Sequence, residues 1–231
     1  MVKRTVVFIL AVLCAFSLCA CRESADVTEG GFTVASTGNE YVLCRFLSVY
    51  AVNAGDPYVK YGSELVYEVQ FEDPNEFLCV YDSMEYLVYR NKSLPELTVD
   101  SFAPVAAMIY DGTNTRWIAS FFADDEYLPE DQRGINESQD TYVCRAIAEA
   151  LTEGENVDVA SDNMALSNRY FIRLTSQNYP GLFYTVFFFC DNNGVFYLRD
   201  RAINKNVVCP REVLERMIGG SAAEAAEGEE L

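Results

Sequence analysis

Histidine is absent from all 231 residues of the chain. Its absence excludes Ser-His-Asp and Cys-His nucleophile systems, histidine general bases and every zinc site that needs an imidazole. The sequence also contains no glycine-rich phosphate loop, no dinucleotide fingerprint and no Cys-x-x-Cys pair. We therefore predict no cofactor and no metal site, and the usual sequence marks of an enzyme are missing.

Positive charge is scarce as well. The chain has 17 lysine and arginine residues against 35 aspartate and glutamate residues, which gives a formal net charge of −18. Such an acidic surface repels nucleic acid, and it also repels an anionic membrane. We expect no nucleic-acid partner, and any attachment to a membrane would have to come from a lipid rather than from basic side chains.

The N-terminus carries a pattern of its own. Lys3 and Arg4 precede an apolar run over residues 6–20, which is typical of a secretory signal and is shorter than the roughly 20 apolar residues of a membrane-spanning helix. The run ends in Leu18-Cys19-Ala20-Cys21, which resembles the lipobox of bacterial lipoproteins. The resemblance implies that residues 1–20 are removed and that Cys21 is lipidated. It also implies that the protein is anchored to the bacterial cell membrane, facing outside the cytoplasm.

Composition divides the remainder into three parts. Residues 21–39 are polar and contain glycine, which predicts a flexible tether, and residues 219–231 form an acidic tail. Residues 40–218 predict a globular domain, because half of the chain is apolar and 13% is aromatic. This domain could also consist of two small half-domains with a boundary near residues 155–168.

The pattern of apolar residues predicts an α+β fold, mainly an antiparallel β-sheet with two helices packed on it. Strands are expected where β-branched and aromatic residues lie between turn formers: 41–52, 65–71, 77–81, 85–90, 105–110, 116–122, 169–175, 182–190 and 195–199. Residues 182–190 are apolar on both faces, which favours a central strand. Helices are expected over residues 138–153 and 210–218, where apolar residues recur at helical spacing.

Five cysteines remain after the signal and the lipidation site are set aside: Cys44, Cys79, Cys144, Cys190 and Cys209. Each lies within an apolar run, and none has the spacing of a metal or redox motif. We expect most of them to be buried thiols, with one or two disulfides as the alternative outside the cytoplasm.

Two groups of residues are candidates for a site. Five acids, Asp124, Asp125, Glu126, Glu130 and Asp131, lie within eight residues, and they favour a solvated loop over a catalytic pair or a calcium site. Aromatic residues in or near the strands could form a binding surface, and the candidates are Trp117, Tyr179, Tyr184 and Tyr197.

We therefore predict a non-enzymatic lipoprotein that binds an envelope protein or a glycan. The alternatives are a hydrolase that cleaves glycans with paired carboxylates and a secreted domain that inhibits another enzyme.

Overall fold

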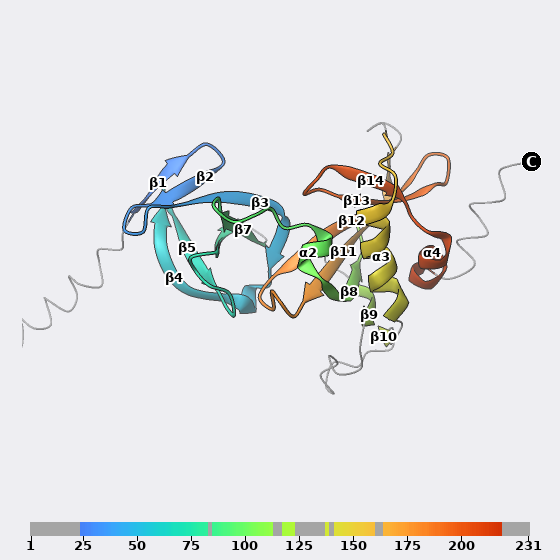
Figure 1. The fold of residues 1–231 in the computed structure, drawn as a ribbon, viewed down its shortest axis with the longest axis horizontal. Coiled ribbons are helices and arrows are strands. Elements are labelled where there is room, and N and C mark those ends of the chain that lie inside the picture. The colour runs from blue at the N-terminus through green and yellow to red at the C-terminus, as the bar shows by residue number, and fades with distance from the viewer. Residues whose placement is uncertain are drawn as a thin grey trace, which may run out of the picture.

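The computed structural model describes residues 24–82, 85–112, 117–122, 137–138, 141–159 and 164–218. Leu18, Cys19, Ala20 and Cys21 lie outside these residues, as does the segment 219–231 that is expected to be an acidic tail. The described chain forms two lobes that lie side by side, with the first seven strands in one lobe and the later strands and helices in the other (Figure 1). Among the described residues, none of the helices combines the length and the apolar character needed to cross a membrane.

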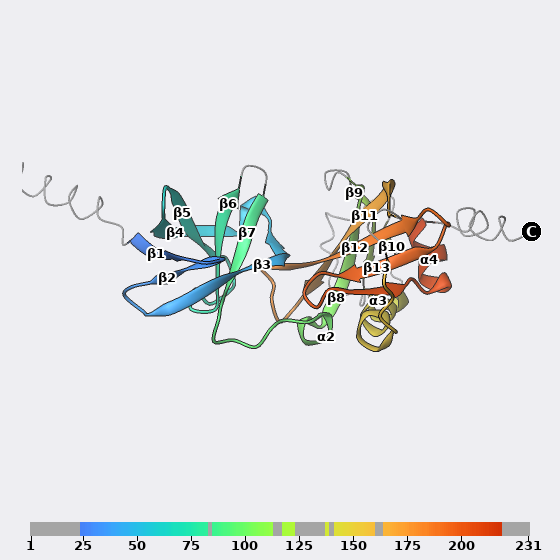
Figure 2. The ribbon, with the colours of Figure 1, turned by 90° about the horizontal axis from the view of Figure 1, so that it is seen from above.

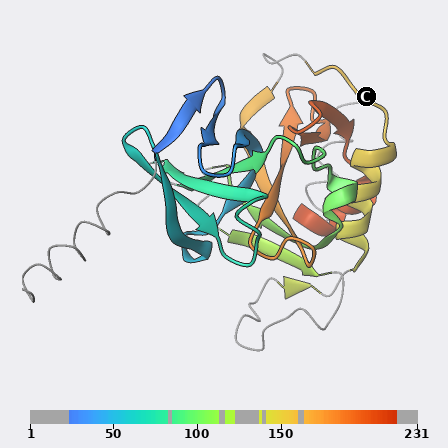
Figure 3. The same cartoon turned by 60° about the vertical axis from the view of Figure 1, so that its left-hand side comes forward.

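The first lobe is a closed barrel of seven strands. These strands are β1 (Ser24–Thr28), β2 (Gly31–Val34), β3 (Asn39–Val49), β4 (Ala54–Tyr61), β5 (Glu64–Val69), β6 (Phe77–Asp82) and β7 (Glu85–Asn91), with a short 3-10 helix, η1, at Ala51–Asn53. Neighbours pair in antiparallel fashion around the ring β1-β2-β3-β7-β6-β5-β4. A parallel pair between β1 and β4 completes the ring (Figure 3).

Alternate residues of all seven strands fill the barrel. The buried cluster and the partly buried residues packed against it include Ala25, Phe32, Val34, Tyr41, Leu43, Val59, Val66, Leu78, Val80, Leu87 and Tyr89. Phe32 lies near its centre, with its ring centroid 5.3, 5.1 and 5.0 Å from those of Tyr41, Tyr61 and Tyr89. Because strand residues alternate between two faces, one face of each strand supplies this interior.

The second lobe is a sheet with helices. Its strands are β8 (Pro104–Tyr110), β9 (Trp117–Phe122), β10 (Glu137–Ser138), β11 (Met164–Ser176), β12 (Phe183–Asp191), β13 (Phe196–Asp200) and β14 (Lys205–Val208). They lie in the order β10-β9-β8-β11-β12-β13-β14, with every pair antiparallel except the short β9–β10 pair. The helices are α2 (Val99–Phe102), α3 (Thr141–Glu153) and α4 (Arg211–Ile218).

The two faces of this sheet differ in what covers them. Ile172 and Leu174 of β11 are fully buried in the same core cluster as Ile147 of α3 and Val213 of α4. Figure 2 shows α3 lying along that face. The intervening residues of β11, among them Arg173, point to the opposite face and are only half-buried.

The lobes are joined by backbone pairing and by a shared core. Phe183 and Tyr184 of β12 pair with Ser48 and Leu47 of β3. Phe102 of α2 belongs to the same core cluster as Phe77 of the barrel, and this cluster also includes the helix-facing residues of the second sheet.

A close approach between the lobes occurs at Gly181. Its N–H donates to the Glu72 carboxylate at 2.8 Å. A Cβ atom at this position would lie 2.2 Å from the backbone oxygen of Gln70, so the approach requires glycine.

The predicted α+β class is wrong. The molecule is mostly β, with more than half of the described residues in strands, a closed seven-stranded barrel and only three short α-helices in the described part. The reason is physical: the hairpins that build an open antiparallel sheet also build a barrel, and closure depends on the long-range pair between β1 and β4. Every individual strand and helix predicted from the sequence is nevertheless present.

The domain limits differ from the expected ones. Residues 24–28 and 31–34 form β1 and β2 of the barrel, within the segment expected to be a tether. Their few apolar residues, such as Ala25 and Phe32, are enough to form barrel strands, because only one face of each strand is buried. The chain passes from one lobe to the other over residues 92–103, whereas residues 155–159 lie within the second lobe, where the Val157 N–H donates to the Asn206 carbonyl.

Candidate functional site

The face of the second sheet that points away from the helices carries aromatic and cationic side chains. One row across four strands consists of Tyr110 on β8, Phe171 on β11, Phe187 on β12 and Arg199 on β13, which lie opposite one another in register. All four side chains are half-buried. A sheet face with this composition is neither a sealed core nor an ordinary polar surface.

Arg173 lies at the centre of this face. Its neighbours across the strands are Met108 on β8 and Thr185 on β12. The guanidinium carbon is 4.6 Å from the ring centroid of Tyr110, 5.1 Å from that of Tyr50 and 5.9 Å from that of Phe183. We call Arg173 together with Tyr50, Met108, Tyr110 and Phe183 the Arg173 site.

Both lobes contribute to this site. Tyr50 directly follows the barrel strand β3, and its ring contacts that of Phe183 on β12 with a centroid separation of 4.0 Å. The hydroxyl groups of Tyr50 and Tyr110 are 2.7 Å apart and share a hydrogen bond. Burial, followed by this hydrogen bond, raises the pKa of Tyr110, so the phenol stays protonated and does not neutralise Arg173.

Arg173 has no acidic partner in the part of the chain that the structure describes. The salt bridges found there join Lys92 to Glu40, Arg145 to Glu149 and Arg211 to Glu215. The Nε atom of Arg173 is buried and has no hydrogen-bond partner. The aromatic faces stabilise the cation by about 0.5–2 kcal/mol each but do not accept a hydrogen bond from this Nε–H. This is unexpected in a chain with twice as many acids as bases.

The arrangement is suited to binding an anion. A guanidinium presents its N–H groups as a planar fork that matches a carboxylate, a sulfate or a phosphate. The surrounding rings restrict the orientation of that fork, which lowers the entropy lost on binding. The tyrosine, methionine and phenylalanine side chains around it offer apolar surface and hydroxyl groups, and the guanidinium is the group among them that can hold an anion.

The five cysteines supply no reactive group either. All five are buried thiols. Burial raises the pKa of Cys79 and of Cys209 to about 12, so these two thiols remain protonated at neutral pH. A protonated, buried thiol is a poor nucleophile.

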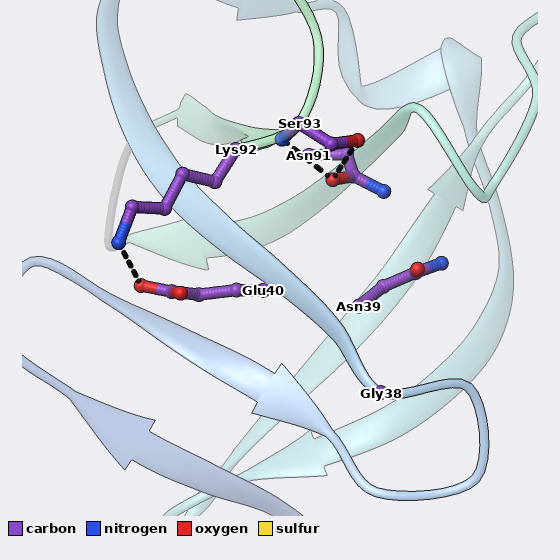
Figure 4. Close-up of a pocket in the computed structure, with 6 residues that line it drawn as sticks. All are labelled: Gly38, Asn39, Glu40, Asn91, Lys92 and Ser93. Carbon is purple, nitrogen blue, oxygen red and sulfur yellow. Dashed lines mark hydrogen bonds and ion pairs between the residues drawn. The ribbon is translucent and has the colours of Figure 1, made fainter.

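A hollow lies on the barrel, at the start of β3 and the end of β7 (Figure 4). Its volume is about 340 Å³, and it is lined by Gly38, Asn39, Glu40, Asn91, Lys92 and Ser93. The Lys92 ammonium pairs with Glu40 at 2.8 Å, and the Asn91 side-chain oxygen accepts from the backbone N–H and the hydroxyl of Ser93 at 3.0 and 2.8 Å. Because these groups already satisfy one another, the hollow is a weaker candidate than the Arg173 site.

Of the aromatic residues singled out from the sequence, Tyr179, Tyr184 and Tyr197 do not form a common exposed surface. Tyr184 is fully buried and donates to both carboxylate oxygens of Asp200 at 2.7 and 2.8 Å. Tyr197 is buried and donates to Asp191, while Tyr179 stacks on Phe102 between the lobes.

Trp117 begins β9 opposite Tyr110, but its side chain lies outside what the structure describes. The loop that contains Asp124, Asp125, Glu126, Glu130 and Asp131 also lies outside the described residues.

Arg173 itself was not predicted as a site residue. The signal available in the sequence was a basic residue within a predicted aromatic strand, in the segment RYFIRLT. Strand alternation places Arg173 opposite the buried face. The local pattern does not include Tyr50, Tyr110 and Phe183, which come to the site from three other parts of the chain.

No protein-family model, no curated protein and no solved structure matches this chain. Of the two sites described above, the Arg173 site is the one with unused binding capacity.

Proposed function

We propose that the protein is a non-enzymatic binding protein, anchored outside the cytoplasm of a bacterial cell by a lipid on Cys21, which holds the anionic group of its ligand at Arg173. The lipobox-like residues support the anchor. The partner is an envelope protein or a glycan that carries at least one carboxylate, sulfate or phosphate.

The observation that carries this proposal is a guanidinium held between Tyr50, Tyr110 and Phe183 without an acidic partner among the described residues. The buried Nε–H of Arg173 has none of the protein acceptors that a buried donor needs, which is unfavourable in the free protein. An incoming anion would supply those acceptors, and a hydrogen bond between charged groups contributes about 1.5–3 kcal/mol.

The test is a binding screen with the chain from Arg22 onward, which retains every described residue. Sugars and peptides that carry a carboxylate, sulfate or phosphate are compared with neutral analogues by calorimetry. We expect only the anionic ligands to bind, and Arg173→Gln to weaken binding by roughly 10-fold to 100-fold. Arg145→Gln is the matched control, because Arg145 is an exposed arginine on α3 and should not contribute. Equal binding by wild type and Arg173→Gln would disprove the proposal.

The anchor is tested separately, in cells. Cys21→Ala should abolish labelling by a fatty-acid probe and block cleavage before residue 21, while Cys19→Ala should leave the mature mass unchanged. Continued labelling of the Cys21→Ala variant would exclude lipidation at this residue.

A further inference from the structure

Two more arginines share the open face of the second sheet with Arg173. Arg199 on β13 lies opposite Phe187, and the guanidinium of Arg201 lies 5.2 Å from the centroid of the Phe187 ring. Arg201 directly follows the end of β13, and its contact with the Phe187 ring places it on the same face. The face thus holds three cations next to aromatic rings.

These two arginines also lack acidic partners within salt-bridge distance in the described part of the chain. One terminal nitrogen of Arg199 donates to the Asn204 side chain at 2.9 Å, and its Nε atom is buried without a partner. Burial lowers the pKa of Arg201, and the neighbouring cations Arg45 and Arg199 lower it further, with Glu85 acting in the opposite direction. Like charges gathered in this way repel one another until an anion binds.

The spacing of the cations matches an extended ligand. Arg173 on β11 lies opposite Thr185 of β12, and Arg199 on β13 lies opposite Phe187, two residues further along, so their backbones are about 12 Å apart. Phe171 and Phe187 lie side by side in the adjacent row, with centroids 4.8 Å apart. The face therefore offers two cationic positions with apolar rings close to both.

We propose that this face binds an acidic glycan, which lies across the strands with one anionic group at Arg173, the next at Arg199 and Arg201, and its sugar rings over the aromatic row. The inference rests on the proposed function and names the class of ligand for the same site. The two bound anionic groups are carboxylates or sulfates on two sugars of the same chain. The sugar between them is either neutral or carries a charge that none of these arginines binds.

An extended peptide fits this face less well. Strands β11 and β12 are hydrogen-bonded on both sides, so neither offers an edge to which a peptide could pair. The side chains available are guanidinium groups and rings, which give donors and apolar surface but few acceptors for peptide N–H groups. The carboxylate and ring oxygens of a glycan need donors instead.

Nucleic acid fits the face less well for a different reason. The chain carries a net charge of −18, which opposes a dense polyanion, and three arginines do not offset that charge. A ligand with widely spaced charges meets less repulsion, because charges more than about 8–10 Å away are screened at physiological salt.

The experiment compares ligands of two lengths on three proteins. The probes are galacturonic acid, its hexamer, the carboxyl-reduced hexamer, a sulfated hexasaccharide and a hexamer of glutamate, titrated into wild type, Arg173→Gln and the double variant Arg199→Gln/Arg201→Gln. Wild type should bind an acidic hexasaccharide at least 10-fold more tightly than the monomer and should not bind the reduced hexamer. The double variant should reduce hexasaccharide affinity to that of the monomer while leaving the monomer unaffected, whereas Arg173→Gln should weaken both.

Several outcomes would separate the two proposals. A hexasaccharide that binds no better than the monomer, or a double variant that behaves as wild type, overturns the extended site and leaves the anion site at Arg173 intact. Equal or tighter binding of the glutamate hexamer overturns the choice of a glycan. Failure of every anionic probe to bind overturns both proposals.

The preference between the uronate and the sulfated probe identifies the anionic group. The variant Arg199→Lys/Arg201→Lys, which keeps the charge, should retain part of the length dependence, and thermal unfolding of each variant verifies that it is folded.

Discussion

The two lobes use the same kind of strand in different ways. In the barrel, one face of each of the seven strands is consumed by an enclosed interior, with Phe32, Tyr41 and Tyr89 packed together. In the second lobe, helices cover one face of the sheet, and the opposite face is left half-buried, with Arg173 among its rings. Closing a sheet on itself yields a stable unit, whereas covering it on one side leaves a surface that can bind.

Aromatic residues illustrate the same difference. In the barrel, rings contact other rings and stabilise the fold. At the Arg173 site, Tyr110 and Phe183 contact a cation, and Tyr50 joins them from the end of a barrel strand. The barrel therefore contributes to the candidate site through one residue and through the pairing of β3 with β12.

The largest expected effect comes from removing one ring from each core. Phe32 and Phe188 are both fully buried, and we expect Phe32→Ala and Phe188→Ala each to lower the free energy of unfolding by about 3–5 kcal/mol. Hydrogen exchange measured peptide by peptide should show that Phe32→Ala weakens protection mainly in β1, β2 and β4. Phe188→Ala should weaken protection in both lobes, because its core cluster includes barrel residues such as Phe77. Identical exchange patterns for the two variants would contradict the expected difference between a separate barrel interior and a core shared by both lobes.

An intermediate effect is expected at the contact between Glu72 and Gly181. Burial raises the pKa of Glu72 to about 7; the Gly181 N–H opposes this shift, and nearby Glu76 adds to it. The folded protein then holds the proton more tightly than the unfolded chain, so the free energy of unfolding is highest below pH 4.5 and falls as the pH rises to about 7. For this half-buried group, we expect a decrease of roughly 1 kcal/mol.

The Glu72→Gln variant keeps an acceptor for the Gly181 N–H and should flatten this decrease. Glu64→Gln, at an exposed strand position, is the control and should leave the slope unchanged. Burial also raises the pKa of Asp200, so some dependence on pH should remain. Urea unfolding at pH 4.5, 6 and 7.5 measures the difference, and an unchanged slope in Glu72→Gln would show that the contact does not titrate.

The smallest effect is expected at the barrel hollow. Lys92 and Glu40 are 60% and 40% exposed, so Lys92→Ala should change the free energy of unfolding by less than about 1 kcal/mol. It should also leave binding of anionic ligands unchanged, in contrast to Arg173→Gln. A marked loss of binding in Lys92→Ala would move the candidate site from the second lobe to the barrel.

Local signals in the sequence predicted the elements but not their assembly. The Asp191-Asn192-Asn193-Gly194 turn and the apolar strands around it specify a hairpin within a few residues, and β12 and β13 form that hairpin. The helix at Thr141–Glu153 follows from apolar spacing in the same way. Closure of the barrel depends instead on residues 24–25 meeting residues 60–61, and a local pattern does not record such a contact.

The candidate site was harder to predict for a related reason. Composition showed that basic residues are outnumbered two to one by acids, and alternation separates Arg173 from the buried Ile172 and Leu174. Whether an arginine has an acidic partner within salt-bridge distance, however, depends on side chains from distant strands. Tyr184 shows the opposite case, because it was a candidate for a binding surface, whereas the structure buries it and the Asp200 carboxylate accepts its hydrogen bond inside the core.

The position of β1 has a consequence for where ligands would be met. Only Arg22 and Glu23 separate Cys21 from Ser24, so a lipid on Cys21 would lie within about 10 Å of the barrel. The second lobe lies on the far side of the barrel from this end of the chain (Figures 1 and 2). The barrel would then separate the arginine face from the bilayer surface by the width of one lobe. This face would meet ligands only in a thin layer parallel to the membrane.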